Sequence, residues 1–287
     1  MIVPLAGVVV GALGSSAWAL NRMALATLRP PVRPVQRTPS DAGLVHEEVE
    51  FSSGGLTLRG WWIEGSPRAE APAAVLVHGW AANAGRMMPV AEALVAAGVS
   101  VLAFDVRGHG RSDAASVVTL RHYRDDVQAA LRFLAERRPG GRTVLVGHSM
   151  GGAAAILATA DGHPVGALAL LAAPADLLEV TQGWMRDNGV PGHFAVPLLL
   201  PFWRLQTGEP WSRLRPEERI AEVSVPTLIV QGGADRRVPP IHADRLAERR
   251  EVPITRVEDA DHMGLLEREV THRALLSLIR GLEGSTA

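Results

Sequence analysis

Residues 143–152 of this chain read Thr143-Val144-Leu145-Val146-Gly147-His148-Ser149-Met150-Gly151-Gly152. An apolar run typical of a buried strand leads into a Gly-x-Ser-x-Gly turn, and a helix is predicted to follow over residues 151–160. The two glycines permit a tight turn in which larger side chains would collide with the backbone. Such a strand-turn-helix lifts the serine hydroxyl clear of the sheet and directs free helix N–H groups toward it.

Apolar runs on both sides of this turn predict a mostly parallel sheet. Continuous Val, Leu and Ile runs suit strands that are covered on both faces. Amphipathic stretches alternate with them, so we expect an α/β fold with a sheet of about eight strands flanked by helices. The expected strands are 49–52, 56–63, 73–77, 99–106, 143–147, 165–171, 227–230 and 254–257, and the expected helices are 86–97, 123–137, 151–160, 241–250 and 268–282.

Two residues downstream of Ser149 complete a candidate catalytic triad. A serine hydroxyl is a poor nucleophile at neutral pH, so it needs a base and a group that orients the base. The expected chain order for this architecture is Ser, then an acid, then His. Asp235 and His262 each follow an expected strand, at the sheet edge where α/β proteins bind ligands. We therefore predict Ser149 as nucleophile, His262 as base and Asp235 as supporting acid.

Other polar residues near these positions are interpreted as structural. Asp259 and Asp261 are adjacent to His262 in sequence, so they are expected in turns or caps. His148 is expected to be packed, and His109 to support its own loop.

The oxyanion is expected to bind two backbone N–H groups, those of Met150 and of Trp80 in the loop after residues 73–77.

The stretch 176–222 interrupts the alternation of strands and helices. It holds several of the chain's few aromatic residues, and an aromatic insertion at this point is a candidate lid over an active site. Ordinary packing of a helical excursion is the alternative. The candidate substrate-contacting residues are Trp184, Phe194, Phe202 and Trp203.

Composition excludes several classes of function. The 287 residues carry a formal net charge of −1 without a basic block, so no nucleic-acid partner is expected. Cysteine is absent, which excludes disulfides, thiol catalysis and Cys-ligated metals. No zinc-type ligand spacing occurs, and neither a metal nor an organic cofactor is expected.

The first 21 residues carry no charged side chain. A helix over residues 2–20 would be roughly 28 Å long, close to the thickness of a bilayer core, so we expect a single-pass membrane anchor. Arginines follow the segment, and the positive-inside rule then places the catalytic domain in the cytoplasm. A cleaved signal peptide ending near Ala17-Trp18-Ala19, with export, is one alternative. A helix packed on the domain is another.

Three regions are expected along the chain. The anchor or signal segment covers residues 1–21, and a Pro- and Arg-rich linker covers 22–44. We expect this linker to hold the catalytic domain, residues 45–287, away from the bilayer. The number of subunits is left open.

These motifs resemble the α/β-hydrolase superfamily from about residue 49 onward. The resemblance rests on residues 77–80 as the oxyanion loop, 105–112 as the D-x-R-G-x-G-x-S segment, 147–151 as the serine turn, and 231–235 and 261–262 as the acid and histidine loops. Within the superfamily the chain is similar to the monoglyceride-lipase and serine-aminopeptidase-like esterases. Serine at position 149 argues against the branches that use an aspartate nucleophile. The resemblance implies hydrolysis of carboxylic esters through an acyl-enzyme.

The apolar residues of the stretch 176–222 favour a lipophilic small-molecule ester as substrate. The same triad could instead cleave thioesters or amides, as an aminopeptidase does, or transfer the acyl group to another acceptor. A non-catalytic binding protein of the same fold is the remaining alternative, although such proteins usually lack a triad residue.

Overall fold

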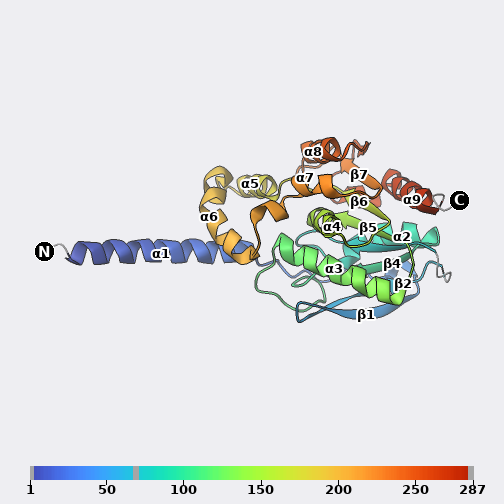
Figure 1. The fold of residues 1–287 in the computed structure, drawn as a ribbon, viewed down its shortest axis with the longest axis horizontal. Helices are drawn as coiled ribbons and strands as arrows, with labels where there is room; N and C mark the ends of the chain where they lie inside the picture. The colour runs from blue at the N-terminus through green and yellow to red at the C-terminus, as the bar shows by residue number, and fades with distance from the viewer. Residues whose placement is uncertain (1–2, 67–70, 284–287) are drawn as a thin grey trace.

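An eight-stranded sheet forms the centre of the protein. The computed structural model describes residues 3–66 and 71–283 but not the side chains of residues 3–13 and 283 (Figure 1). The strands are β1 His46–Ser53, β2 Leu56–Ile63, β3 Ala73–Val77, β4 Ser100–Phe104, β5 Thr143–His148, β6 Ala167–Leu171, β7 Thr227–Gly232 and β8 Ile254–Val257. Their spatial order is β1-β2-β4-β3-β5-β6-β7-β8. β1, β2 and β4 pair antiparallel, and all pairs from β4 to β8 are parallel.

Helices cover both faces of the sheet, as the alternating pattern predicted. Side chains of α3 Leu120–Arg137, α4 Met150–Ala160 and α8 Ile241–Arg250 pack in one core cluster. Side chains of α2 Met88–Ala96 and α9 Glu269–Glu283 pack in the other. β3 and β6 are buried along their whole length, because both of their faces lie under helices. The expected α/β-hydrolase sheet is thus confirmed.

A helical insertion separates β6 from β7. It contains α5 Leu177–Asp187, α6 Gly192–Thr207 and the short helix α7 Pro216–Arg219, with 3₁₀ turns at Trp211–Leu214 and Ile220–Glu222. Asp176 begins α5 as its N-cap, accepting a hydrogen bond from the Leu178 N–H at 2.7 Å. Further 3₁₀ turns lie at Ser40–Ala42, Ala84–Met87 and Gly264–Glu267.

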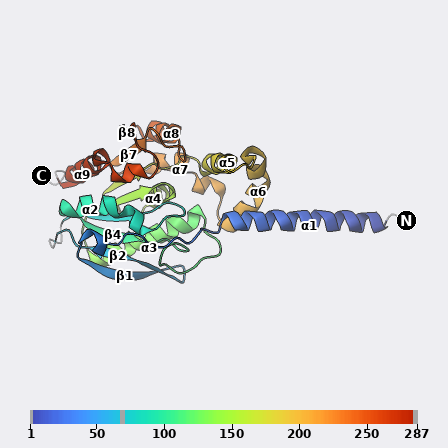
Figure 2. The same ribbon diagram turned by 180° about the vertical axis from the view of Figure 1, so that it is seen from behind.

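The N-terminal helix α1, Val3–Thr27, projects from the domain and contacts it near its C-terminal end (Figures 1 and 2). There Ala24 is buried in a small apolar cluster with residues of α5 and α6. The indole N–H of Trp203 on α6 donates to the Thr27 hydroxyl at 3.0 Å. The last turns of α1 are therefore fixed to the insertion.

The membrane-spanning anchor expected over residues 1–21 finds no support. In the part of the chain whose side chains are described, no helix is long and apolar enough to cross a membrane. The expectation falls mostly on residues 1–13, whose side chains lie outside that part.

The segment after α1 lies along the domain. A spacer over residues 22–44, as expected from the sequence, would instead lead away from the domain. The Leu28 carbonyl accepts the Val118 N–H at 2.8 Å. The Asn83 side-chain amide donates to the carbonyls of Arg33 and Pro34, each at 3.2 Å. Residues 30–38 have no regular secondary structure, yet these contacts dock them beside the loop that follows β3.

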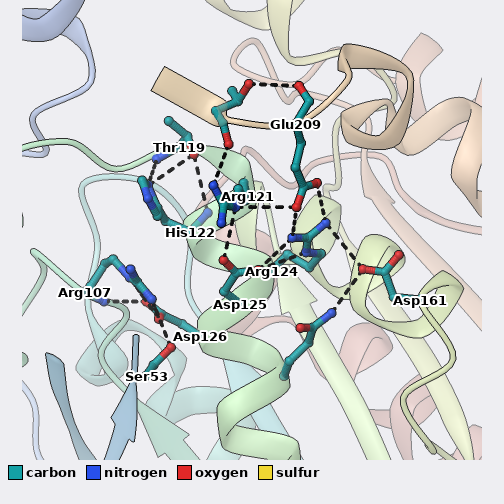
Figure 3. A network of polar contacts seen from close by, with 12 residues as sticks. Ser53, Arg107, Thr119, Arg121, His122, Arg124, Asp125, Asp126, Asp161 and Glu209 are labelled. Atoms are coloured by element: carbon teal, nitrogen blue, oxygen red, sulfur yellow. Dashed lines mark hydrogen bonds and ion pairs between the residues drawn. The ribbon is translucent and has the colours of Figure 1, made fainter. Parts of the chain in front are cut away.

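An ionic network joins α3 to the C-terminal end of α6, within the insertion (Figure 3). Arg124 donates two hydrogen bonds to the carboxylate of Glu209, at 2.8 and 2.6 Å, and lies 3.4 Å from Asp161. Arg121 donates to the Thr207 carbonyl at 2.9 Å. These contacts fix the exit of α6 against the main domain, because paired and partly buried charges hold their geometry better than exposed ones.

A second part of this network holds the loop after β4 (Figure 3). The Arg107 guanidinium pairs with the Asp126 carboxylate of α3 at 2.5 Å, and both side chains are buried. Asp126 also accepts the Arg107 backbone N–H at 2.9 Å, and Arg107 donates to the Ser53 hydroxyl at 3.0 Å. The D-x-R-G segment is thereby attached to α3 and to β1.

Candidate active site

Ser149 occupies the turn between β5 and α4. Its backbone torsions, φ 55° and ψ −125°, lie in a region that side-chain-bearing residues rarely adopt. The Ser149 N–H donates to the Leu171 carbonyl of β6 at 2.9 Å, which helps to hold this strained conformation. The turn expected from the sequence is therefore formed by the residues that predicted it.

Two glycines are required here because backbones approach closely. A Cβ at Gly147 would lie 2.4 Å from the Gly151 carbonyl oxygen. A Cβ at Gly151 would lie 2.4 Å from the carbonyl oxygen of Val77. Neither neighbouring atom belongs to a side chain that could move, so only glycine fits at either position.

His262 and Asp235 meet at the carboxyl ends of β7 and β8. The His262 Nδ1 lies 2.7 Å from the Asp235 Oδ2, and both side chains are buried. The other carboxylate oxygen, Oδ1, accepts the N–H groups of Arg237 and Val238, both at 2.9 Å. Asp235 is thus held by its own loop in the orientation that keeps the Nδ1 proton of His262 in place.

His148 contacts His262 directly, which the sequence did not indicate. Its Nε2 lies 2.9 Å from the His262 carbonyl oxygen and donates a hydrogen bond to it. The two imidazole rings lie 4.6 Å apart. The pKa of His148 is lowered to about 3, mainly by burial and secondly by the neighbouring His262. A neutral His148 therefore supports the backbone of His262 from a position next to Ser149.

The loop after β3 lies against the serine turn. A Cβ at Gly79 would lie 2.9 Å from the Ser149 Cβ and 3.4 Å from its hydroxyl oxygen. Trp80 follows in this loop, half-buried. Met150 is the first residue of α4, so its N–H is among those that a helix leaves without an intrahelical partner. Both expected oxyanion residues are thus adjacent to the serine turn.

The acidic neighbours of His262 have structural roles. Asp261 Oδ1 accepts the N–H groups of Met263 and Gly264, at 3.2 and 2.7 Å, as a turn-capping residue does. Asp259 pairs with Arg268 at 3.1 Å. Within the described ranges, no three His, Asp or Glu side chains gather as a metal site would require.

The four aromatic residues expected to contact substrate have different surroundings. Trp184 and Phe194 are 59% and 66% exposed on the insertion. Trp203 is 7% exposed and donates to Thr27 of α1, and Phe202 packs at the edge of the same cluster. This packing of Phe202 and Trp203 was not predicted, because no local sequence signal indicates that α1 packs against α6.

Comparisons with known proteins agree with the architecture. The family model described as serine aminopeptidase, S33, matches residues 69–200. A monoacylglycerol lipase of Mycolicibacterium smegmatis is 38% identical over 94 residues, which are 32% of each chain. The uncharacterized protein YfhR of Escherichia coli O157:H7 is 28% identical over 76% of this chain and 73% of its own length.

Among solved structures, the esterase Pf2001 of Pyrococcus furiosus superimposes with a TM-score of 0.67. The alignment covers 89% of this chain and 97% of the esterase at 24% identity, a level at which the likeness shows the fold. The fold, the serine turn and these relatives together identify the chain as a serine hydrolase of the α/β-hydrolase superfamily, in its esterase- and lipase-like part.

Proposed function

We propose that the chain hydrolyses carboxylic esters with Ser149, His262 and Asp235 as its catalytic triad. The observation that carries this proposal is the 2.7 Å hydrogen bond between His262 and Asp235. The two residues follow the ends of β8 and β7, beside the strained turn that holds Ser149. An imidazole oriented in this way presents its other nitrogen, Nε2, as the base for a serine hydroxyl.

The reaction has two halves. His262 Nε2 takes the Ser149 proton as the oxygen attacks the ester carbonyl carbon, and the N–H groups of Trp80 and Met150 bind the oxyanion. When the tetrahedral intermediate collapses, the C–O bond to the alcohol breaks and His262 gives its proton to the leaving oxygen. Water then attacks the acyl-enzyme with His262 again as base, which releases the carboxylic acid and restores Ser149.

The substrate is proposed to be a lipophilic ester, and the segment 176–222 to be the lid. Two observations support this: one relative is named monoacylglycerol lipase, and α6 exposes Phe194, Leu198 and Leu205. Trp184 and Phe194 remain the candidates for contact with substrate, because they are exposed on the insertion. Trp203 would act through α1, to which it is hydrogen-bonded, and Phe202 packs against the same apolar cluster.

Labelling with a fluorophosphonate probe tests the nucleophile. The wild-type chain should be labelled, and Ser149→Ala should not. Ser277→Ala, at an exposed position on α9, is the matched control and should label fully. Equal labelling of wild type and Ser149→Ala would refute the assignment.

A substrate panel tests the bond type and the lipophilic preference. p-Nitrophenyl esters of increasing acyl length should show rising kcat/KM, and a flat profile would contradict a lipophilic site. Matched thioesters and aminoacyl anilides should be slower than esters. Faster cleavage of anilides would favour the aminopeptidase alternative, and products formed with an added alcohol would favour acyl transfer.

A further inference from the structure

Two buried histidines connect the loop after β3 with the loop after β4. His78, in the first loop, accepts the Val106 N–H of the second loop at its Nε2, at 3.0 Å. His109, in the second loop, accepts the Ala81 N–H of the first loop at its Nε2, at 3.3 Å. Each loop thus supplies an imidazole to a backbone amide of the other. We call these two bonds the histidine clasp.

Both rings are in the tautomer that the clasp requires. The Nδ1 atoms of His78 and His109 lie 2.8 and 3.0 Å from the carbonyl oxygens of Gly79 and Arg107. A carbonyl can only accept, so each Nδ1 carries the proton and each Nε2 is a hydrogen-bond acceptor. The Nε2 of His109 is shared by two donors, the Ala81 N–H and the Tyr123 hydroxyl. Burial lowers the pKa of His78 to about 4 and that of His109 to about 3, so both rings are neutral acceptors near neutral pH.

The His109 bond holds a strained residue next to the proposed oxyanion donor. Ala81 has φ 57°, a left-handed conformation that a non-glycine residue keeps only when surrounding contacts impose it. Trp80, the residue before it, also packs its ring edge-on against the His109 ring, with centroids 5.6 Å apart. His109 therefore fixes both the backbone after Trp80 and the Trp80 side chain.

Small displacements of this loop matter because it borders the nucleophile. Gly79 lies so close to Ser149 that even a methyl group would not fit between them. We propose that His109 is a positioning residue: by holding the Ala81 N–H, its Nε2 keeps the Trp80 amide aimed at the reacting carbonyl. This inference rests on the proposed ester hydrolysis for its catalytic consequence, but not for the clasp itself.

Two substitutions at one position separate the acceptor from the rest of the ring. In His109→Asn the side-chain amide can replace Nδ1 toward Arg107 but is too short to reach Ala81. In His109→Gln the side-chain oxygen can reach the position of Nε2. Tyr123→Phe is the control, because the Tyr123 hydroxyl is the other donor at this Nε2, at 3.2 Å, and its removal leaves the Ala81 bond intact.

Kinetics on p-nitrophenyl butyrate should show a kcat effect. A misplaced oxyanion donor lowers turnover more than binding, so His109→Asn should reduce kcat about 10- to 100-fold with KM nearly unchanged. His109→Gln should recover most of the loss, and Tyr123→Phe should stay within about threefold of wild type. Equal losses in His109→Asn and His109→Gln, or a change in KM alone, would overturn the proposal.

Amide hydrogen exchange tests the clasp without any substrate. Peptides covering residues 78–87 should exchange faster in His109→Asn than in wild type, His109→Gln or Tyr123→Phe. Unchanged exchange in His109→Asn would overturn the clasp. If His109→Asn fails to fold, wild-type-like exchange and kcat in His109→Gln support the proposal, and lost protection there refutes it. A wild type that cleaves no ester would instead refute the proposed function, while the exchange result still decides the clasp.

Discussion

Adding one methyl group at Gly79 should separate the oxyanion loop from the nucleophile. In Gly79→Ala the new Cβ would lie 2.9 Å from the Ser149 Cβ. Carbon atoms in contact lie about 3.5–4.0 Å apart, so the two chains must separate by at least ~0.6 Å. The Ser149 Cβ is attached to the strained turn and cannot rotate away, so the loop after β3 has to move.

The displacement sets the size of the effect. A shift of about 1 Å at a reacting centre can cost about 100-fold in rate, and loss of a whole oxyanion donor costs about 100- to 1,000-fold. A shift near 0.6 Å should therefore lower kcat about 10- to 100-fold, or about 1.4–2.7 kcal/mol in activation free energy. Gly79 has no positive φ, so alanine adds no strain through its own torsions. Overpacking of the contact with Ser149 should lower the free energy of unfolding by about 1–3 kcal/mol.

Steady-state hydrolysis of p-nitrophenyl butyrate, with urea unfolding of the same preparation, provides the assay. Gly281→Ala in α9 is the control, because an added Cβ there meets nothing within 4 Å. Its kcat should equal that of wild type. A Gly79→Ala enzyme with wild-type kcat, or one whose lost activity follows its unfolded fraction, would refute the placement of the oxyanion loop.

In Asp235→Asn the side-chain oxygen can still accept the N–H groups of its loop, but the NH₂ group faces His262 and favours the wrong tautomer of that imidazole. The kcat should fall about 10⁴-fold in a folded protein, and a loss under tenfold would count against Asp235 as the acid. Asp126→Ala leaves Arg107 buried without its carboxylate, so urea unfolding should show a loss of about 3–5 kcal/mol, whereas a loss below about 1 kcal/mol would contradict the role of this pair. Burial lowers the pKa of His78, His109 and His148, so these rings stay neutral in the folded protein at a pH where the unfolded chain binds protons. Stability should therefore fall as pH drops from about 6.5 toward 4, by about 1.4 kcal/mol per pH unit for each ring. Urea midpoints at pH 7.5 and 5.0 check this, and equal midpoints would contradict it.

The sheet could be predicted because its strands are continuous apolar runs separated by turns. Each of the eight expected runs overlaps an observed strand, and the order of Ser149, Asp235 and His262 along the chain follows from where strands end. The path of the first 44 residues could not be predicted. An apolar helix that packs on a neighbouring helix has the same composition as one that faces lipid, so α1 gave no sign of its contact with α6.

Contacts between loops that are distant along the chain could not be predicted from the sequence either. His148 was expected to be packed, but its bond to the His262 carbonyl joins residues 114 positions apart. His109 was expected to support its own loop, and it reaches Ala81, 28 positions away. Such pairs have no periodicity, so their motifs indicated a special loop without indicating its partner.

The docked segment after α1 changes where the catalytic unit begins. Residues 28–37 lie outside the region matched by the family model, yet Asn83, in the loop that continues from the oxyanion loop, is bonded to two of their carbonyl groups. A chain shortened to start at residue 45 would expose these amide donors to solvent and release one side of that loop.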